Sequence, residues 1–252
     1  MKQLTILITS PGVATAANIF FALKDANFAS LIRILSAGND DNCALAHLTS
    51  HFHQLPSINA DSYVDELINL CVSESIDCLF PVHSTEIEKI AQRAQDFWKN
   101  SILVVAADYE NISRFNDKVA FSRYCNKHNL PTIKTYEFSK SLKFPIYVKP
   151  KSGSSSKGHF VANSYNELIS NLDPETLKEK YILQEVIDAP EITVDAYSSF
   201  IDSTVTCLPR LRLRVQDGKA TSCKAFYDEE LIALCTHILQ TSNYRGPCNL
   251  QF

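Results

Sequence analysis

Residues 144–158 read FPIYVKPKSGSSSKG, and the rest of the chain is interpreted around this stretch. We expect Ile146 to Val148 to form a short apolar strand that ends at Pro150, because proline lacks a backbone donor. The small residues between Lys151 and Gly158 let successive backbone N–H groups approach an anion, and the lysines add positive charge. The stretch therefore predicts a phosphate-binding loop. It is not the GxxxxGKS/T loop of P-loop enzymes, and a plain surface loop is the alternative.

The composition is that of an ordinary globular protein with room for two domains: 252 residues, 45% of them hydrophobic, with a formal charge of −4. The acidic balance disfavours a broad nucleic-acid-binding surface. Eight cysteines without a CxxC pair are typical of a reduced protein rather than a disulfide or zinc protein. There is no signal-peptide core and no apolar run as long as a membrane span. We therefore expect a cytoplasmic protein that binds neither nucleic acid nor membrane.

The first part of the chain alternates strands with helices. The hydrophobic pattern predicts strands at 4–8, 31–35, 78–82 and 102–106 and helices at 14–26, 63–74 and 85–98, with a capping box from Thr85 to Glu88. Such alternation indicates βαβ units and a parallel sheet. Residues 1–110 are therefore predicted to form a Rossmann-like domain, within which an irregular segment carries His47, His51 and His53.

The order of elements changes after about residue 110. The pattern predicts helices at 117–128, 164–171 and 228–241 and strands at 146–148, 160–161, 181–185, 191–197, 204–208, 211–215, 219–225 and 249–252. Most of these strands follow one another through short turns, which favours antiparallel pairing. Residues 111–252 are therefore predicted to form an α+β domain, and the whole chain is of the α/β class.

Several short motifs follow one another at informative spacing. Residues 116–118 (NDK) open a helix that ends at 129–131 (NLP), the stretch 144–158 comes next, and 183–187 (LQEVI) precede 190–195 (PEITVD). In this succession the chain resembles the ATP-grasp superfamily, and it is most similar to the carbamoyl-phosphate-synthase-like branch. Members of that branch carry a Rossmann-like pre-ATP-grasp domain in front, which residues 6–12 (ILITSPG) fit. The resemblance implies a pre-ATP-grasp domain over 1–110 and an ATP-grasp domain over 111–252 that is incomplete at its C-terminal end.

The resemblance also implies an ATP site. Lys118 and Lys149 would contact phosphates, the loop would close over the β- and γ-phosphates, Glu185 would accept from the exocyclic amine of adenine, and Glu191 would hold the ribose. Such chemistry suits cations, free N–H groups and carboxylates. The residues assigned to the nucleotide in this way are Lys118, Lys149, Ser152, Gly153, Ser154, Ser155, Ser156, Lys157, Gly158, Gln184, Glu185, Val186, Ile187 and Glu191.

Each of these assignments has a simpler alternative. Glu185 and Glu191 are equally typical of exposed strand carboxylates. The pair 117–118 also suits a helix start, where an acidic side chain favours the helix dipole. Lys149, in contrast, flanks an apolar strand, where an ammonium without a partner is costly, and this favours a function.

Arg210, Arg212 and Arg214 alternate with apolar residues, so on a strand they would share one face. Like charges in such a row repel unless an anion or carboxylates neutralise them. In the family that the chain resembles, an R-x-R strand faces the active-site cleft, which implies that Arg210 and Arg212 act on a substrate carboxylate or phosphate, together with Lys149. A solvated face is the alternative, and it suits Arg214 better.

The metal ligands are the part of the family pattern that is missing. The family holds Mg²⁺ with a Glu-x-Asn-x-Arg segment soon after the strand that 249–252 resembles, and the sequence has none there. Gln251 falls where the branch has a further metal-contacting residue. We therefore expect a piece of a larger protein, or else a chain whose metal ligands come from another chain, that binds nucleotide weakly and catalyses little. His47, His51 and His53 have no carboxylate at an evident spacing, which favours a polar loop over a metal site.

The leading interpretation is an ATP-grasp carboxylate–amine or carboxylate–ammonia ligase that uses ATP and Mg²⁺ and acts through an acyl phosphate. Its partners would be a small carboxylate and an amine or ammonia, with a homodimer by analogy. The alternative is a nucleotide-binding regulatory or partner-binding fragment without turnover. A Rossmann oxidoreductase is a third interpretation, weakened because the GxGxxG motif is absent from 9–12.

Overall fold

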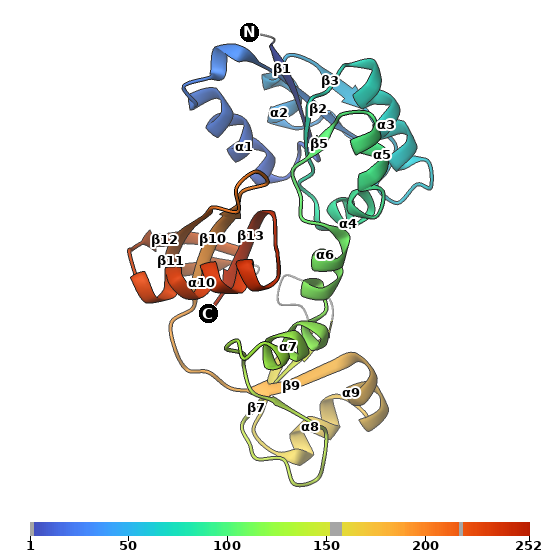
Figure 1. Ribbon diagram of the computed structural model, residues 1–252. Coiled ribbons are helices and arrows are strands. Elements are labelled where there is room, and N and C mark those ends of the chain that lie inside the picture. Colours follow the sequence, from blue (N-terminus) through green and yellow to red (C-terminus); the bar gives the residue numbers. More distant parts are fainter. Residues whose placement is uncertain (1–2, 152–157, 217–218) are drawn as a thin grey trace. The chain divides into compact units, whose positions relative to one another are not determined.

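The computed structural model describes residues 3–151, 158–216 and 219–252 (Figure 1). The chain divides into two compact units, Met1–Tyr109 and Glu110–Phe252. Each unit has its own sheets and core.

The first unit is built on one parallel sheet with the strand order β3-β2-β1-β4-β5. Its strands are β1 (Leu4–Thr9), β2 (Ile32–Gly38), β3 (Phe52–Gln54), β4 (Cys78–Phe80) and β5 (Leu103–Val104). β1 lies in the centre, where Ile6 is paired with Ile34 of β2 and with Cys78 of β4. The order reverses beside β1, as in doubly wound folds. The predicted Rossmann-like architecture is confirmed.

Helices cover this sheet on both faces because the central strand is apolar on both sides. The helices are α1 (Ala14–Asp25), the 3₁₀ helix η1 (Ala29–Leu31), α2 (Ala44–Leu48), α3 (Tyr63–Ser73), α4 (Ser84–Gln92) and α5 (Ala94–Lys99). Ile6 and Ile8 belong to a core with Ala16 and Phe20 of α1. Leu7, which alternates with them, belongs to the opposite core with Leu67 of α3 and Ile90 of α4.

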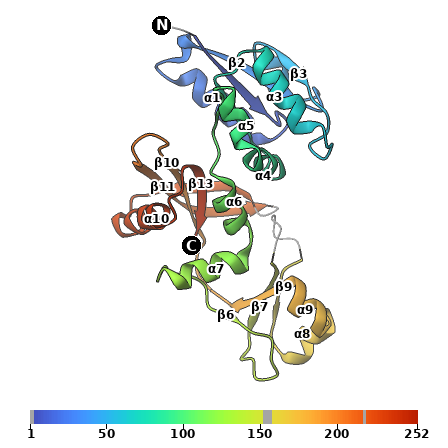
Figure 2. The same ribbon diagram turned by 45° about the vertical axis from the view of Figure 1, so that its right-hand side comes forward.

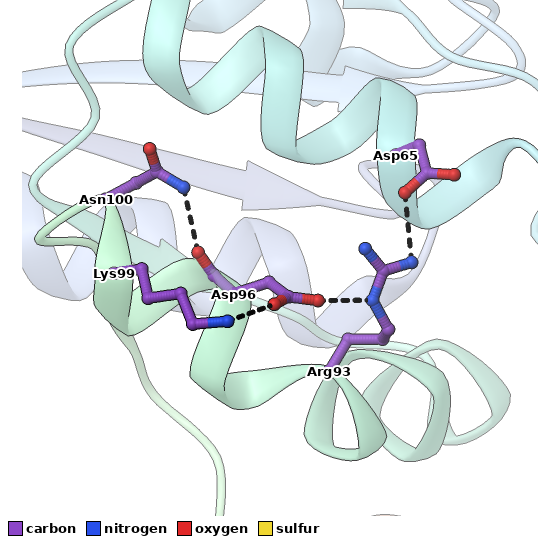
Figure 3. A network of polar contacts seen from close by, with 5 residues as sticks. All are labelled: Asp65, Arg93, Asp96, Lys99 and Asn100. Carbon is purple, nitrogen blue, oxygen red and sulfur yellow. Dashed lines mark hydrogen bonds and ion pairs between the residues drawn. The ribbon is translucent and has the colours of Figure 1, made fainter.

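The single helix predicted over 85–98 is two helices, so that prediction was wrong in detail. Arg93 ends α4 and precedes α5, and Figure 3 shows its guanidinium between Asp65 of α3 (2.9 Å) and Asp96 of α5 (2.5 Å). Asp96 also contacts Lys99 at 3.2 Å, and its carbonyl accepts from Asn100. The capping box lies two residues earlier than predicted, because Glu86 and not Glu88 accepts from the N–H of the N-terminal residue, His83.

Other boundaries in the first unit also differ from the prediction. β2 continues through Ser36 to Gly38, where the sequence predicted the end of the strand. The segment predicted to be irregular contains α2 and β3, and β3 is paired in parallel with the extended end of β2. A three-residue edge strand has too few residues to show an alternating pattern, which explains why the sequence did not predict it.

The second unit contains two antiparallel sheets. One has the order β6-β9-β7-β8 and the other β12-β11-β10-β13. The strands of the first sheet are β6 (Thr135–Tyr136), β7 (Ile146–Pro150), β8 (Phe160–Ala162) and β9 (Tyr181–Glu185). α8 (Tyr165–Asn171) and α9 (Pro174–Lys180) pack against one face of it, where Leu168 and Leu177 join Ile146, Val148 and Leu183 in the core (Figure 2).

The second sheet consists of β10 (Ile192–Ser198), β11 (Val205–Gln216), β12 (Lys219–Ala225) and β13 (Gly246–Gln251), and α10 (Glu229–Thr241) packs against it (Figure 1). Two strands were predicted where β11 is continuous. Pro209 lies inside β11, and its carbonyl still accepts from Phe226. α6 (Tyr109–Asn116), α9 and β6 were not predicted, whereas α7 (Lys118–Lys127) begins beside its predicted cap, Asp117.

Candidate functional site

The face of the β6-β9-β7-β8 sheet opposite α8 and α9 carries the first group of predicted site residues. Side chains of a strand alternate between faces, so the residues between the core residues of β7 and β9 point the other way. Tyr147 lies directly opposite Gln184, and Lys149 directly opposite Ile182. We call these four residues the lysine face.

Lys118 lies close to the lysine face because α7 starts beside the end of β7. The Asp117 carboxylate accepts from the N–H groups of Val119 and Ala120 and so fixes the helix start, and Lys118 N donates to the Lys151 carbonyl at 3.2 Å. Burial lowers the pKa of the Lys118 ammonium, and Asp117 offsets part of this. Burial also lowers the pKa of Lys149, and the charge of Lys118 lowers it further. Two partly desolvated cations thus repel each other here, which an anion would relieve.

Two aromatic rings, of Tyr147 and His159, adjoin Lys149. The Lys149 ammonium lies 5.9 Å from the centre of the Tyr147 ring, and the His159 ring stacks on Tyr147 at 5.5 Å. Burial raises the pKa of Tyr147, and the negative charge of Glu191 adds to the effect. Neither aromatic residue was predicted from the sequence to belong to the site. The signal was available for Tyr147, which is two residues from Lys149 and so shares its face.

The predicted phosphate loop lies mostly outside the described residues, which exclude Ser152, Gly153, Ser154, Ser155, Ser156 and Lys157. At its far end Gly158 has a φ of +73°, a backbone conformation that favours glycine. At its near end the Lys151 ammonium donates to the Lys178 carbonyl of α9 at 2.7 Å.

The predicted adenine segment, 184–187, begins with a buried side chain and ends with exposed ones. Gln184 is 5% exposed, and its Oε1 has no hydrogen-bond partner among the described residues. Glu185 Oε1 accepts from the backbone N–H of Lys134 at 2.9 Å. Val186 and Ile187 follow the strand with exposed side chains. One oxygen of the Glu185 carboxylate, predicted to accept from an exocyclic amine, is therefore already bonded to the backbone.

The second group of predicted residues lies on the β12-β11-β10-β13 sheet. Thr193 of β10 is directly opposite Arg210 of β11 and Gln251 of β13, and Asp195 is directly opposite Asn249. The face that these residues share is opposite to the one on which Cys235 and Ile238 of α10 are buried. We call it the arginine face, and its members are Glu191, Thr193, Asp195, Arg210, Arg212, Asn249 and Gln251.

Carboxylates already neutralise the cations of the arginine face. The Asp195 carboxylate accepts from Arg210 Nε at 2.6 Å and from Arg210 Nη2 at 2.8 Å, and it accepts from Asn249 Nδ2 at 2.8 Å. Hydrogen bonds from Arg210 to Asp195 raise the pKa of the guanidinium, so it stays charged. The nearly buried Arg212 forms an ion pair with Glu191. Asp195 and Asn249 were not selected from the sequence, although 195 alternates with 191 and 193 on β10.

Arg214 does not continue this row, contrary to the expectation that the three arginines share one face. The register of β11 against β12 shifts between Arg212 and Arg214 and again before Val215. Such irregularities place an extra residue in one strand and interrupt the alternation of side chains. Arg214 is exposed.

Metal ligands do not gather in the part of the chain that the structure describes: no group of three His, Cys, Asp or Glu side chains is placed to hold an ion there. Gln251 is exposed on the arginine face. The rings of His51 and His53 lie 4.6 Å apart, and His53 Nε2 is 3.5 Å from Glu74 Oε1. Burial lowers the pKa of His53. No described helix has the length and apolar character to cross a membrane.

The first unit has its own buried polar cluster at the turn after β1, where a dinucleotide would bind in a Rossmann enzyme. Glu86 is fully buried and accepts from Ser10 Oγ at 2.8 Å and from the Tyr63 hydroxyl. Burial raises the pKa of Tyr63, and the neighbouring Glu86 raises it further. The Glu86 side chain thus occupies this turn through hydrogen bonds within the first unit.

The comparisons with known proteins agree with this architecture. Residues 6–105 match the family model of the PylC-like N-terminal domain. The biotin carboxylase domain of 2-oxoglutarate carboxylase from Hydrogenobacter thermophilus, solved with MgADP, ADP and bicarbonate, superposes with a TM-score of 0.77 over 100% of this chain and 61% of its own, at 13% identity. N5-carboxyaminoimidazole ribonucleotide synthetase, solved with ADP, gives 0.73 over 100% of this chain and 66% of its own, at 15% identity.

The chain has the fold of the ATP-grasp superfamily. The resemblance inferred from the motifs, with a pre-ATP-grasp domain in front, is confirmed at the level of the fold. Among curated proteins, pyruvate carboxylase of Staphylococcus aureus (strain Mu50 / ATCC 700699) is 26% identical over 186 residues, which are 67% of this chain and 16% of that protein. The chain therefore spans less than two thirds of the length of each of these ATP-grasp relatives.

Proposed function

We propose that the chain provides the nucleotide-binding part of an ATP-grasp ligase of the carbamoyl-phosphate-synthase-like branch, which forms carbon–nitrogen bonds. In this proposal residues 1–110 are the pre-ATP-grasp domain and 111–252 the ATP-grasp domain. The observation that carries it is the pair Lys118 and Lys149: burial lowers the pKa of both ammonium groups, and the charge of Lys118 lowers that of Lys149 further. A triphosphate would add negative charge beside both ammonium groups.

The proposed reaction has two steps. A carboxylate oxygen of the substrate attacks the γ-phosphorus of ATP, the bond between that phosphorus and ADP breaks, and an acyl phosphate forms. The nitrogen of an amine or ammonia then attacks the acyl carbon, inorganic phosphate leaves, and the nitrogen gives a proton to solvent. Lys118, Lys149 and the loop over 152–158 would hold the phosphates in line and stabilise their charge. Arg210 and Arg212 would face the substrate carboxylate.

Magnesium usually accompanies ATP and is held largely by phosphate oxygens. The described residues do not fit a metal site built by the protein alone, because Glu191 and Asp195 are ion-paired with arginines. Gln251 is the residue that we propose beside the metal. We further propose that the protein is soluble and cytoplasmic and forms a homodimer. Its substrates would be a small carboxylate and an amine.

The same ion pairs favour a second candidate, a nucleotide-binding module without turnover. Arg210 and Arg212 are committed to Asp195 and Glu191 and so have less capacity to hold a substrate anion. This module would bind ATP on the lysine face and regulate a partner.

Two measurements test the proposal and separate the candidates. Thermal unfolding with ATP, Mg-ATP and NADPH should show a rise in Tm with ATP alone or with Mg²⁺ and none with NADPH, because a ligand that binds only the native state stabilises it. Release of ADP is then followed with a panel of small carboxylates, with and without ammonia. A carboxylate-dependent rate, even the slow one expected of this part of a ligase, supports the ligase; ATP binding with a rate that no carboxylate of the panel changes supports the module. No shift at millimolar ATP contradicts both.

A further inference from the structure

Three cysteines of the second unit gather on the side of the β12-β11-β10-β13 sheet that α10 covers. Cys207 of β11 and Cys248 of β13 are both directly opposite Ala196 of β10, one on each side of it. Residues that lie directly opposite each other on paired strands share one face of the sheet, and Ala196 is buried. Cys235 of α10 is fully buried, and its thiol is hydrogen-bonded to Cys207. The three thiols thus form one cluster between the helix and the sheet.

The strand order decides which of these cysteines can be joined by a disulfide. β10 lies between β11 and β13, so Cys207 and Cys248 are two strand spacings apart, about 10 Å. A disulfide needs Cα atoms within about 7 Å of each other, which excludes this pair. Cys235 lies on the helix that packs against β11, and its hydrogen bond goes to Cys207. Cys207 and Cys235 are therefore the pair that the fold places together.

The two thiols of this pair differ in how well an oxidant can reach them. Cys207 is partly exposed, whereas Cys235 is fully buried. Burial raises the pKa of both thiols, that of Cys235 to about 12, and hydrogen bonds that Cys207 accepts, one of them from Cys235, offset part of the rise at Cys207. The thiolate is the form that attacks an oxidant. Cys207 is therefore the thiol that reacts first, and Cys235 is the thiol behind it that completes the bond.

We propose that Cys207 and Cys235 are a reversible modification site, at which a peroxide joins β11 to α10 through a disulfide. The Cys207 thiolate attacks one oxygen of hydrogen peroxide, the O–O bond breaks, and a sulfenic acid forms while hydroxide takes up the proton that Cys207 released. The Cys235 sulfur then attacks the Cys207 sulfur, the S–S bond forms, and the hydroxyl group leaves with the Cys235 proton as water. Two thiols and one peroxide thus give one disulfide and two waters, and a dithiol reverses the change.

This site is independent of the proposed nucleotide site. Cys207 lies three residues before Arg210 on β11, and side chains three positions apart on a strand point to opposite faces. The cross-link therefore fixes β11 against α10 without using a residue of the lysine face or of the arginine face. Disulfides that form in reducing compartments are usually transient and redox-sensing, which agrees with a resting state in which both cysteines are free.

The test oxidises the reduced full chain with hydrogen peroxide, blocks the remaining thiols with N-ethylmaleimide in urea and identifies cross-linked peptides by mass spectrometry. Most of the disulfide should join Cys207 to Cys235, while Cys71, which is equally buried in the first unit, should remain a thiol. A chain that is unfolded in urea before oxidation should give a mixture of pairs. The same mixture from the folded chain, or a majority of links to Cys248, would overturn the inference.

Variants separate the roles of the three thiols. Cys235→Ala should leave Cys207 as a sulfenic acid, which dimedone labels, and absence of this adduct would show that Cys207 is not the thiol that reacts first. Cys248→Ser is the matched control, because it removes the third thiol of the cluster and leaves the pair, so it should cross-link like the wild type.

Thermal unfolding shows whether the cross-link fits the native structure. The oxidised wild type should have a Tm about 5–10 °C above that of the reduced protein, because a disulfide between residues 207 and 235 restricts the unfolded chain. Dithiothreitol should reverse the rise, and Cys207→Ser should show none. A fall in Tm on cross-linking would mean that the native β11 and α10 do not hold these two thiols together, which contradicts the proposal.

Discussion

The two sheets of the second unit place different neighbours beside their positively charged side chains. Lys149 on the lysine face and Lys118 beside it are partly buried, which lowers the pKa of both, and the charge of Lys118 lowers the pKa of Lys149 further. On the arginine face Arg210 and Arg212 are matched by Asp195 and Glu191. The lysines and the arginines are all positively charged in the sequence. The two groups differ because the fold places carboxylates beside the arginines and a second cation beside Lys149.

The neighbours of a buried cation indicate whether it stabilises the fold or binds a ligand. A cation that is already bound by two carboxylate oxygens and stays charged mainly supports the sheet, whereas cations that are desolvated next to each other lower stability until an anion arrives. The lysine face is therefore the better candidate for a nucleotide. The arginine face is a network within the sheet that a substrate anion would have to share.

The largest expected effect is on the lysine face. Lys149→Met should weaken ATP binding by about a hundredfold, because one charge-assisted hydrogen bond is lost. The free protein should keep or gain thermal stability, because a desolvated ammonium is replaced by an apolar side chain of similar size. Calorimetry and thermal unfolding measure the two quantities. Lys143→Met, at an exposed position near the same sheet, is the matched control and should change neither.

The arginine face should respond in the opposite sense. Asp195→Ala removes both carboxylate acceptors of Arg210 and the acceptor of Asn249, so it should lower the free energy of unfolding by about 1–2 kcal/mol. ATP affinity should change less than twofold. Urea denaturation gives the first quantity and calorimetry the second. A large loss of affinity at full stability would show that this face, too, binds the nucleotide.

The pH dependence of ATP binding tests whether Lys149 is the cation that binds the nucleotide. Because the pKa of Lys149 is lowered in the free protein and a phosphate would raise it again, ATP affinity should be constant below the lowered pKa and fall as pH rises through it. The unfavourable contribution of Lys149 to stability is full below that pKa and is relieved between it and the ordinary pKa of lysine. Lys149→Arg, which stays charged, should bind ATP with a flatter pH profile. A profile identical to that of the wild type would exclude Lys149 as the titrating group.

The smallest effect is expected at Arg214. This residue is exposed beyond the register shift of β11, so Arg214→Ala should change the free energy of unfolding by less than about 0.5 kcal/mol. Under the same urea conditions Arg210→Ala should cost more, since it leaves Asp195 without its cation. Equal losses at the two positions would mean that the ion pair of Arg210 contributes nothing measurable.

The sequence predicted the elements that have strong local signals. The parallel sheet follows from apolar strands alternating with amphipathic helices, and the start of α7 follows from Asp117, which caps it as expected. Elements of two or three residues, such as β3 and β6, were missed because they are too short to show a period. The break at Arg93 was missed because residues 85–98 contain neither glycine nor proline, the usual local signals for the end of a helix.

The candidate site shows the same limit. Lys118, Lys149 and the segment 184–187 were selected from motif spacing. The partners that distinguish one face from the other were not selected, because the pairing of Asp195 with Arg210 and of Tyr147 with Gln184 depends on strand register. Register in turn depends on turns and on the buried face of each sheet, which a single sequence indicates only indirectly.

Lysine acylation in the presence of nucleotide tests most directly whether the nucleotide binds the lysine face. A lysine with a lowered pKa reacts readily with an acylating reagent, and mass spectrometry measures the rate at each position. Lys149 and Lys118 should be protected by saturating ATP and not by NADPH, while Lys143 reacts equally in all samples. Equal labelling of Lys149 with and without saturating ATP would contradict the assignment of the nucleotide to the lysine face.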